Sequence, residues 1–360
     1  MDCALCVFDD DTLGGSKRQP YSCFEESSGR NEETMEIVML EKGSLGADLD
    51  LTYFEALGNV TYYDATTKEE APERVRTADV LIANKLLMNE ETLAGAKNLK
   101  LIALTATGTN NIDFDYTRKR GIQVKNVAGY STDAVAQHTF ALLFYLLHRM
   151  AYYDRYVKSG AYCESKGFSH FAEQFYELPG KTWGIVGMGA IGQKVAALAS
   201  AFGCRVIYYS TSGQNSGQPY EQVDLDTLLS SSDIVSLHAP LNEKTERLIR
   251  RETLDKMKKT AYLINVARGG LVDEQDLADA LREDRIKGAG LDVVTEEPIR
   301  RDNPLLAIQD SRKLVITPHM AWAPIETRER LMRRVYQNIE DTIKQFEQET
   351  NEEEYSYGIL

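Results

Sequence analysis

The chain has 360 residues, of which 43% are hydrophobic, and a formal net charge of -14. This length favours about two domains, and no stretch approaches the roughly 18 consecutive apolar residues of a membrane span. The negative charge disfavours nucleic-acid binding, because phosphate backbones would be repelled. The N-terminus shows no basic region followed by an apolar one, so we expect a cytoplasmic protein with no membrane partner.

The five cysteines show no disulfide framework. Their odd number and irregular spacing suit a reducing compartment. Cys3 and Cys6 form a CxxC pair, but no second pair or histidine completes a zinc site. We therefore expect no metal.

Residues 1–34 combine acidic pairs, serines and glycines with little apolar periodicity, which predicts a disordered tail. From Glu36 onward, strand and helix patterns alternate. Strands are predicted at 37–40, 60–64, 79–84, 100–107 and 122–127, with a helical stretch from Lys68. Repeated βα units imply a parallel sheet covered by helices on both faces. This region has no glycine fingerprint, so it is a candidate for holding the substrate.

A nearly apolar helix is predicted over 131–150, with Ser131 as the N-cap. A helix that is apolar all round is buried, in a passage between domains or in a subunit contact. Residues 152–177 are rich in Tyr and Phe without a clear period. They form either an oligomer-interface arm or a covering layer on their own subunit.

The segment 178–212 reads as a strand, a glycine turn, a helix and a second strand. The turn, Gly187-Met188-Gly189-Ala190-Ile191-Gly192, has the spacing GxGxxG. In a dinucleotide site the first glycine makes a tight turn, the second admits the pyrophosphate, and the third lets the helix pack on the strand. GxGxxG alone is a weak signal, but its place between a strand and a helix predicts a dinucleotide site.

Four more strands are predicted after this segment, at 233–241, 261–270, 288–293 and 313–319. Ligands of open parallel sheets bind outside the carboxyl ends of the strands. His238, Arg268, Asp292 and His319 all lie at such ends. The last helix is predicted over 325–346, followed by a mobile acidic tail over 347–360.

Arg268, Glu297 and His319 are the candidate catalytic residues. Taken singly, each residue type has an ordinary structural explanation: a solvated arginine, a turn glutamate before Pro298, or a core histidine. The segments around them are distinctive: NVARGGLVDEQDLADALREDRIKGAGLDV, EEP and TPHMAWAP follow GKTWGIVGMGAIG and ATGTNNID. Together these motifs resemble the D-isomer-specific 2-hydroxyacid dehydrogenases over about residues 35–346, most closely the glycerate dehydrogenase or hydroxypyruvate reductase branch.

The resemblance implies a role for each residue. Arg268 would hold the substrate carboxylate and polarise the C2 carbonyl. His319 would exchange a proton with the C2 oxygen while a hydride passes between the cofactor and C2, and Glu297 would orient the imidazole. The backbone N–H groups of Thr107 and Gly108 align with the family's carboxylate-binding loop, and Asp292 with its nicotinamide contact. The predicted cofactor-binding positions are Gly187, Met188, Gly189, Ala190, Ile191, Gly192, Ser210, Thr211, His238, Pro240, Val266 and Asp292.

The cofactor type stays open, as NAD or NADP. NAD sites place an acidic residue about 20 residues after the glycines, but Ser210 and Thr211 stand there in this chain. No carboxylate excludes a 2′-phosphate, and no arginine attracts one unless Arg205 folds over the site. We therefore predict that the protein uses both cofactors.

The expected fold is α/β, with two doubly wound parallel-sheet domains. A Rossmann cofactor domain (130–318) would be inserted into a flavodoxin-like substrate domain (35–129 plus 319–346). The expected function is reduction of a small 2-oxo acid such as hydroxypyruvate, glyoxylate or pyruvate, in a homodimer implied by the resemblance. The alternatives are a formate dehydrogenase, which the resemblance disfavours because that branch has Gln in place of Glu297, and a nucleotide-sensing protein like the C-terminal-binding corepressors.

Overall fold

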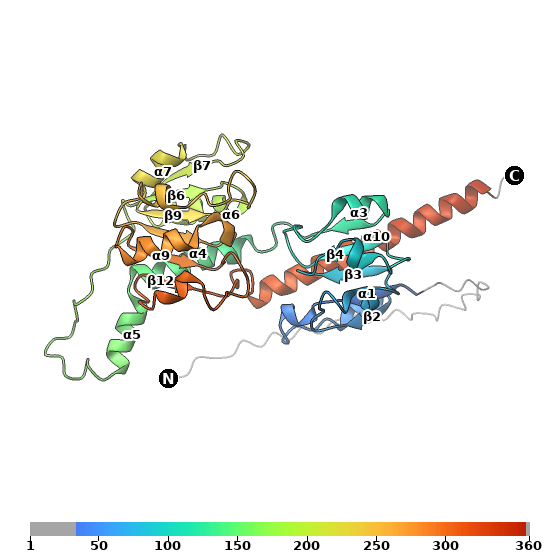
Figure 1. Ribbon diagram of the computed structural model, residues 1–360, viewed down its shortest axis with the longest axis horizontal. Coiled ribbons are helices and arrows are strands. Elements are labelled where there is room, and N and C mark those ends of the chain that lie inside the picture. The colour runs from blue at the N-terminus through green and yellow to red at the C-terminus, as the bar shows by residue number, and fades with distance from the viewer. Residues whose placement is uncertain (1–33, 358–360) are drawn as a thin grey trace, which may run out of the picture. The chain divides into compact units, whose positions relative to one another are not determined.

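Two parallel sheets organise the chain (Figure 1). The computed structural model describes residues 34–357, with side chains described through residue 349. The disordered tail predicted over 1–34 lies, apart from Thr34, outside the described residues, as does the Cys3–Cys6 pair. No helix in the described part of the chain is both long and apolar enough to cross a membrane.

The first sheet has five strands in the order β2-β1-β3-β4-β5, with every neighbouring pair parallel. Its strands are β1 (Glu36–Met39), β2 (Asn59–Tyr62), β3 (Val80–Ala83), β4 (Leu101–Leu104) and β5 (Gln123–Lys125). This is the flavodoxin-like order, in which the chain reverses direction across the sheet between β1 and β3.

The two faces of this sheet bury different clusters because strand side chains alternate. Ile37 and Met39 face one cluster, and Val38 and Leu40 face the other. The first cluster is closed by α10 (Ile325–Tyr357), and the second lies beside the short helices α1 (Ala71–Arg74), α2 (Glu90–Leu93) and α3 (Phe114–Lys119). The turns η1 (Lys42–Leu45) and η2 (Thr52–Leu57) are 3-10 helices.

The second sheet has seven strands in the order β12-β11-β10-β9-β6-β7-β8, again all parallel. The strands are β6 (Thr182–Val186), β7 (Arg205–Tyr209), β8 (Glu221–Gln222), β9 (Ile234–Leu237), β10 (Tyr262–Asn265), β11 (Gly288–Leu291) and β12 (Leu314–Ile316). This is the Rossmann order with one added strand, and it reverses between β6 and β9.

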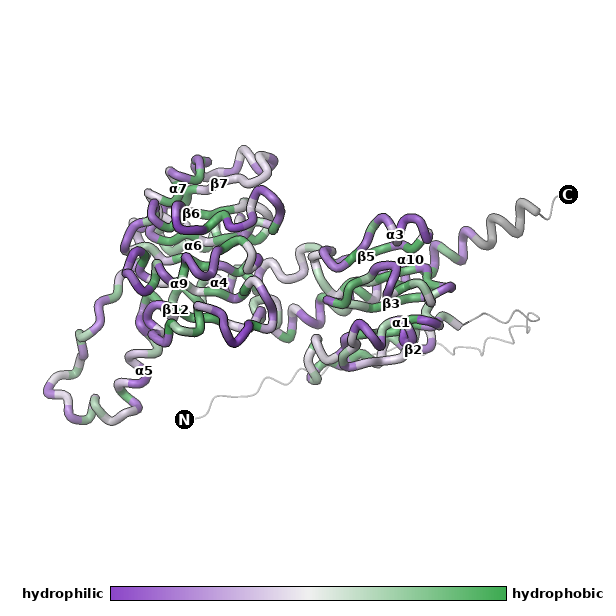
Figure 2. The backbone as a smooth tube through the Cα atoms, in the orientation of Figure 1, coloured by the Kyte–Doolittle hydropathy of each residue, from purple (hydrophilic) through white to green (hydrophobic). Residues whose placement is uncertain are grey.

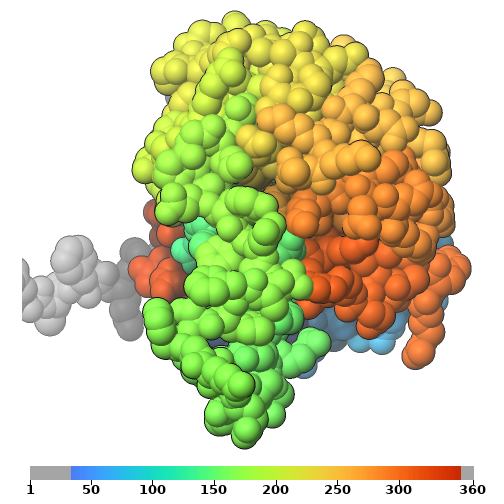
Figure 3. Space-filling view, turned by 90° about the vertical axis from the view of Figure 1, so that its left-hand side faces the viewer, coloured from blue at the N-terminus to red at the C-terminus, as the bar shows by residue number. Residues whose placement is uncertain are grey.

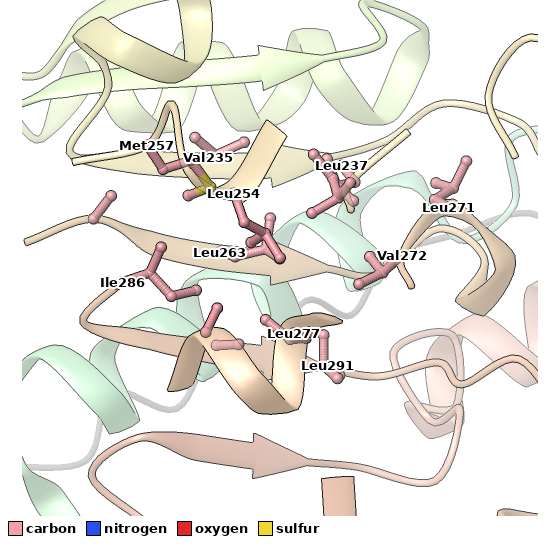
Figure 4. Packing of buried hydrophobic residues seen from close by; sticks show 14 of the residues in the cluster. Val235, Leu237, Leu254, Met257, Leu263, Leu271, Val272, Leu277, Ile286 and Leu291 are labelled. Carbon is pink, nitrogen blue, oxygen red and sulfur yellow. The ribbon is translucent and has the colours of Figure 1, made fainter. Parts of the chain in front are cut away.

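Helices cover both faces of the seven-stranded sheet. On one face lie α4 (Thr132–Leu147) and α6 (Ala190–Ala201), whose apolar side chains share a cluster with the buried Trp183. On the other face lie α7 (Leu225–Ser231), α8 (Arg251–Leu254) and α9 (Glu274–Arg282), around the cluster drawn in Figure 4. The 3-10 helices η3 (Gly269–Leu271) and η4 (Pro304–Ala307) complete the elements. Hydropathy is highest along the strands and α4 (Figure 2).

The predicted fold class is confirmed, and two local predictions need correction. The helix predicted to reach Met150 ends at Leu147, because Arg149 takes a left-handed conformation (φ 55°), after which α5 (Met150–Lys158) begins. Ser131 is the N-cap of α4 as predicted, although its side chain makes no capping hydrogen bond. The last helix continues to Tyr357 instead of ending at Phe346, because its Glu and Gln residues are good helix formers.

Candidate active site

The glycine turn after β6 has the three features of a dinucleotide cradle. Gly187 has φ +92°, and a Cβ there would lie 2.8 Å from the Ala239 nitrogen. A Cβ on Gly192 would lie only 2.2 Å from the Gly187 carbonyl oxygen, so glycine lets α6 pack on the strand. A Cβ on Gly189 would meet nothing within 4 Å, which leaves open space beside the turn. The residues therefore fit a bound pyrophosphate.

The start of α6 adds an electrostatic component to this cradle. Gly189 is the N-cap, and Ala190 and Ile191 form the first turn, which contains no acidic residue. The free N–H groups and the positive end of the helix dipole attract an anion at this position. Met188 between the glycines is buried and belongs to the core, and its carbonyl accepts a hydrogen bond from Gln193.

The other predicted cofactor positions lie at the same edge of the sheet. They follow the ends of β7, β9, β10 and β11, and they are Ser210, Thr211, His238, Pro240, Val266 and Asp292. The Nε2 atom of His238 lies 3.0 Å from the Ser236 hydroxyl. Its Nδ1 atom is buried without a hydrogen-bond partner among the described residues. Burial lowers the pKa of His238 to about 3, so the ring is neutral.

The end of β7 has no charged side chain to select the cofactor. Ser210 accepts a hydrogen bond from the Gly213 nitrogen through its hydroxyl, and no residue of the following loop, 211–220, is charged. Arg205 begins β7, at the opposite end of the strand, and pairs with Glu221 at 2.5 Å. The suggestion that Arg205 could fold over the site is therefore wrong, because the length of the strand separates it from Ser210.

Arg268 and the loop of Gly108 follow strands of different sheets and are in contact. Arg268 follows β10, and Gly108 follows β4. A Cβ on Gly108 would lie 2.9 Å from an Nη atom of Arg268, so the guanidinium rests directly on this glycine. Within the described residues, the backbone N–H groups of Thr107 and Gly108 donate to no other group, while the Thr107 hydroxyl donates to the Val127 carbonyl. A guanidinium beside free N–H groups is suited to a carboxylate.

Glu297 and His319 form a close pair. The Nδ1 atom of His319 lies 2.6 Å from a Glu297 carboxylate oxygen, and both side chains are about one-third exposed or less. Burial pushes the pKa of Glu297 up, but the hydrogen bond and charge of His319, with smaller effects from the Val294 N–H and Lys85, bring it below its ordinary value. Glu297 is therefore ionised and holds the ring by Nδ1, which leaves Nε2 for another partner.

The backbone of His319 is held in an unusual conformation. His319 has φ +49°, a left-handed geometry that costs a residue other than glycine about 1 kcal/mol. Its N–H donates to the Asp292 carbonyl at 2.7 Å, and its carbonyl accepts from the Trp322 indole at 3.0 Å. Trp322 is partly buried in the core below α10, whereas Met320 is exposed. The loop is therefore fixed on both sides of the imidazole.

The carboxylate of Asp292 ties down the same loop. It is buried, and it accepts hydrogen bonds from the Met320 and Ala321 nitrogens, both at 2.9 Å, and from the Thr317 hydroxyl at 2.6 Å. His138 on α4 lies 2.9 Å from the Thr317 hydroxyl oxygen. Thr317 and His138 are not among the predicted site residues. The sequence signal for His138 is weak, since it is one of several polar residues in the first half of a largely apolar helix.

These groups can bind a compound that carries both a carboxylate and a carbonyl group, and they can polarise its carbonyl. Arg268 provides a fixed positive fork, the Thr107–Gly108 loop provides N–H groups, and His319 provides a ring nitrogen that can exchange a proton. In the part of the chain that the structure describes, no group of three or more His, Cys, Asp or Glu side chains could hold a metal ion.

Known proteins resemble this chain over most of its length. Residues 140–321 match the family model described as D-isomer specific 2-hydroxyacid dehydrogenase, NAD binding domain. The hydroxypyruvate reductase of Blautia hydrogenotrophica is 38% identical over 86% of this chain and 97% of its own. The glycerate dehydrogenase of Methylorubrum extorquens is also 38% identical, over 85% of this chain and 96% of its own.

Solved structures of two further proteins are also similar to this chain. An acyclic imino acid reductase in complex with NADPH and D-Arg has a TM-score of 0.76 and 33% identity, covering 86% of this chain and 98% of that one. The D-lactate dehydrogenase of Aquifex aeolicus in complex with NAD and lactic acid has a TM-score of 0.75 and 28% identity, covering 86% and 95%. On this similarity in sequence and fold, the chain belongs to the D-isomer-specific 2-hydroxyacid dehydrogenase family.

Proposed function

We propose that this protein reduces a small 2-oxo acid, such as hydroxypyruvate, glyoxylate or pyruvate, to the D-2-hydroxy acid. The observation that carries this proposal is the contact of Arg268 with the Gly108 loop, at the sheet edge that also carries the Glu297–His319 pair. The names of the relatives, hydroxypyruvate reductase and glycerate dehydrogenase, support the same substrate class.

Arg268 is the substrate-binding residue in this proposal. Its planar guanidinium binds the carboxylate and lies close enough to polarise the C2 carbonyl. The N–H groups of Thr107 and Gly108 bind the carboxylate from the other side. Since glycine leaves room for the guanidinium, any side chain at position 108 would displace Arg268.

His319 is the proton donor for the C2 oxygen. A bound NADH or NADPH supplies the hydride that C2 receives. As the C2 oxygen gains negative charge, His319 donates a proton to it from Nε2, and Glu297 stabilises the imidazolium through Nδ1. In the oxidative direction His319 takes this proton back.

We also propose that each sheet belongs to a separate domain, one for the cofactor and one for the substrate. Residues 130–318 form the cofactor domain, and residues 35–129 with 319–346 form the substrate domain. The neutral hydroxyl-bearing end of β7 supports use of both NADH and NADPH. A ratio of kcat/KM for the two cofactors above about 10³, some 4 kcal/mol, in either direction would overturn the dual-use proposal.

A scan of 2-oxo acids tests the function. Hydroxypyruvate, glyoxylate and pyruvate are each mixed with NADH or NADPH, and the absorbance of the reduced cofactor is followed at about 340 nm. We expect turnover with at least one acid and its loss in Arg268→Ala. If every acid fails in a protein that binds the cofactor, the enzyme proposal is wrong, and a nucleotide-sensing role takes its place.

We propose a homodimer in which residues 150–176 contact the second copy. The helix α5 has no buried residue, and the following segment exposes Phe168 to 94% and Phe171 to 87%. Figure 3 shows this segment, in green, standing out from the surface. The segment has defined contacts, since the His170 ring stacks on Tyr156 at 3.7 Å and lies 2.8 Å from the Tyr152 hydroxyl. Exposed aromatic patches of this kind mark protein interfaces.

Light scattering coupled to size-exclusion chromatography tests the dimer. The double variant Phe168→Ser and Phe171→Ser should shift the mass from two chains to one. A monomeric parent protein would contradict the proposal.

We also propose a cytoplasmic location, supported by the free thiols of Cys163 and Cys204. Recovery of the native protein in a secreted fraction would contradict this location.

A further inference from the structure

We propose that His138 and Thr317 are positioning residues, which hold the loop of His319 through the buried carboxylate of Asp292. This inference rests on the proposed function, because it concerns the same proton donor. Neither residue touches the substrate in this account. Both act on the geometry of the imidazole.

The order of donors along this chain follows from simple counting. The carboxylate of Asp292 can only accept, so the Thr317 hydroxyl gives its single proton to Oδ1 across 2.6 Å. The Thr317 oxygen must then accept the bond from His138, whose Nε2 lies 2.9 Å away. His138 therefore carries a proton on Nε2. The chain runs from His138 to Thr317 to Asp292.

The far end of this chain is the loop that carries the imidazole. Asp292 holds the N–H groups of Met320 and Ala321 through its side chain, and that of His319 through its carbonyl. If Thr317 released Oδ1, the carboxylate would be free to rotate away from these N–H groups. The left-handed conformation of His319 would then lose its support.

The near end of the chain is rigid. His138 belongs to α4, and its neighbours Val135 and Leu142 are buried in the core under the seven-stranded sheet. The Nε2 atom of His138 also lies 3.4 Å from Asp292 Oδ1, so its position is set by two partners. The buried helix α4 therefore holds the Nε2–H group of His138 in place. This hydrogen-bond donor comes from outside the catalytic loop.

Matched pairs of variants test the proposal. Thr317→Val keeps the shape and removes the hydroxyl, while Thr317→Ser keeps the hydroxyl. His138→Phe removes the donor, while His138→Gln places an amide N–H near the former Nε2 position. We expect Thr317→Val and His138→Phe to lower kcat about 10- to 100-fold, as for a displaced catalytic group, with a much smaller change in the Kd of NADH because the glycine turn at 187–192 is untouched. Thr317→Ser and His138→Gln should retain most of the parent kcat.

Several results would overturn the inference. One is a kcat in Thr317→Val equal to that of the parent, and another is equal loss in Thr317→Val and Thr317→Ser. If Thr317→Val fails to fold, the His138 pair decides by the same comparison. Nitrogen-15 NMR of histidine provides a measurement without variants: the proton should be on Nε2 of His138, and a neutral ring protonated on Nδ1 would contradict the chain. A parent protein inactive on every 2-oxo acid would refute the proposed function, whereas the NMR result would still judge the hydrogen-bond chain.

Discussion

The glycine turn at 187–192 and the catalytic loop at 317–321 follow strands of the same sheet, yet their shapes have different causes. The turn takes its shape from missing side chains, since a Cβ at Gly187 or Gly192 would collide with backbone atoms. The loop takes its shape from hydrogen bonds to Asp292, a buried residue that follows another strand. The first kind of shape requires glycine at fixed positions of one motif, and the second requires a particular side chain that follows another strand.

This difference makes the two regions sensitive to different changes. Added volume should damage the turn and leave the loop intact. Loss of one carboxylate should damage the loop and leave the turn intact. The four predictions below test this contrast.

Among these four predictions, Asp292→Asn should have the largest effect. Each carboxylate oxygen faces a backbone N–H, of Met320 or of Ala321, so either orientation of the amide places its NH₂ against a donor. We expect a loss of about 3 kcal/mol in the free energy of unfolding, from two charge-assisted hydrogen bonds, and a kcat lowered about 10- to 100-fold. Urea titration and steady-state kinetics measure the two effects. A variant as stable as the parent would show that these bonds do not hold the loop.

Gly192→Ala should destabilise the protein by about 1–3 kcal/mol, even though alanine favours the helix by roughly 0.5–1 kcal/mol. The added Cβ would lie 2.2 Å from the Gly187 carbonyl oxygen and 3.3 Å from Ile185. The helix must therefore move off the strand, and cofactor affinity should fall with stability. Thermal melting with and without NADH checks this. An unchanged melting temperature would contradict the close packing of α6 on the strand.

Gly189→Ala separates binding from folding. A Cβ at this position meets no atom within 4 Å, and Gly189 has an ordinary extended conformation (φ -75°), so the melting temperature should stay within a degree or two of the parent. The methyl group would occupy the space that the pyrophosphate needs, and the Kd of NADH should rise about tenfold, which is about 1.4 kcal/mol. Fluorescence titration measures the Kd. Equal affinity would place the pyrophosphate elsewhere.

The smallest expected effect is on the pH dependence of stability, which should differ between a variant of the loop and a variant of the turn. Burial raises the pKa of Asp292, but hydrogen bonds from His138, Thr317 and the two backbone N–H groups outweigh it and bring the pKa below its ordinary value. A carboxyl with a lowered native pKa contributes stability above its unfolded pKa and loses it as the pH falls through the native pKa. The stability difference between parent and Asp292→Asn should therefore narrow below about pH 4. The difference for Gly192→Ala should not, because no titratable group is involved.

Much of the fold could be predicted because its signals are local. Strand periodicity, the GxGxxG spacing and the position of polar residues at strand ends placed the two sheets and the cofactor edge, and family motifs pointed to Arg268, Glu297 and His319. The catalytic roles remain proposals. The end of α4 could not be predicted because it depends on the left-handed conformation of Arg149. The link from His138 to Asp292 through Thr317 joins residues 154 positions apart in the sequence, and no spacing rule indicates such a contact.

The most direct test of the account is the turnover of His319→Ala with the 2-oxo acid that the parent protein reduces fastest. If His319 donates the proton to the C2 oxygen, kcat should fall about 10²- to 10⁴-fold while the Kd of NADH stays nearly unchanged. Turnover equal to that of the parent would remove His319 from the mechanism. The hydrogen bonds of Asp292 to the catalytic loop would then have no catalytic role.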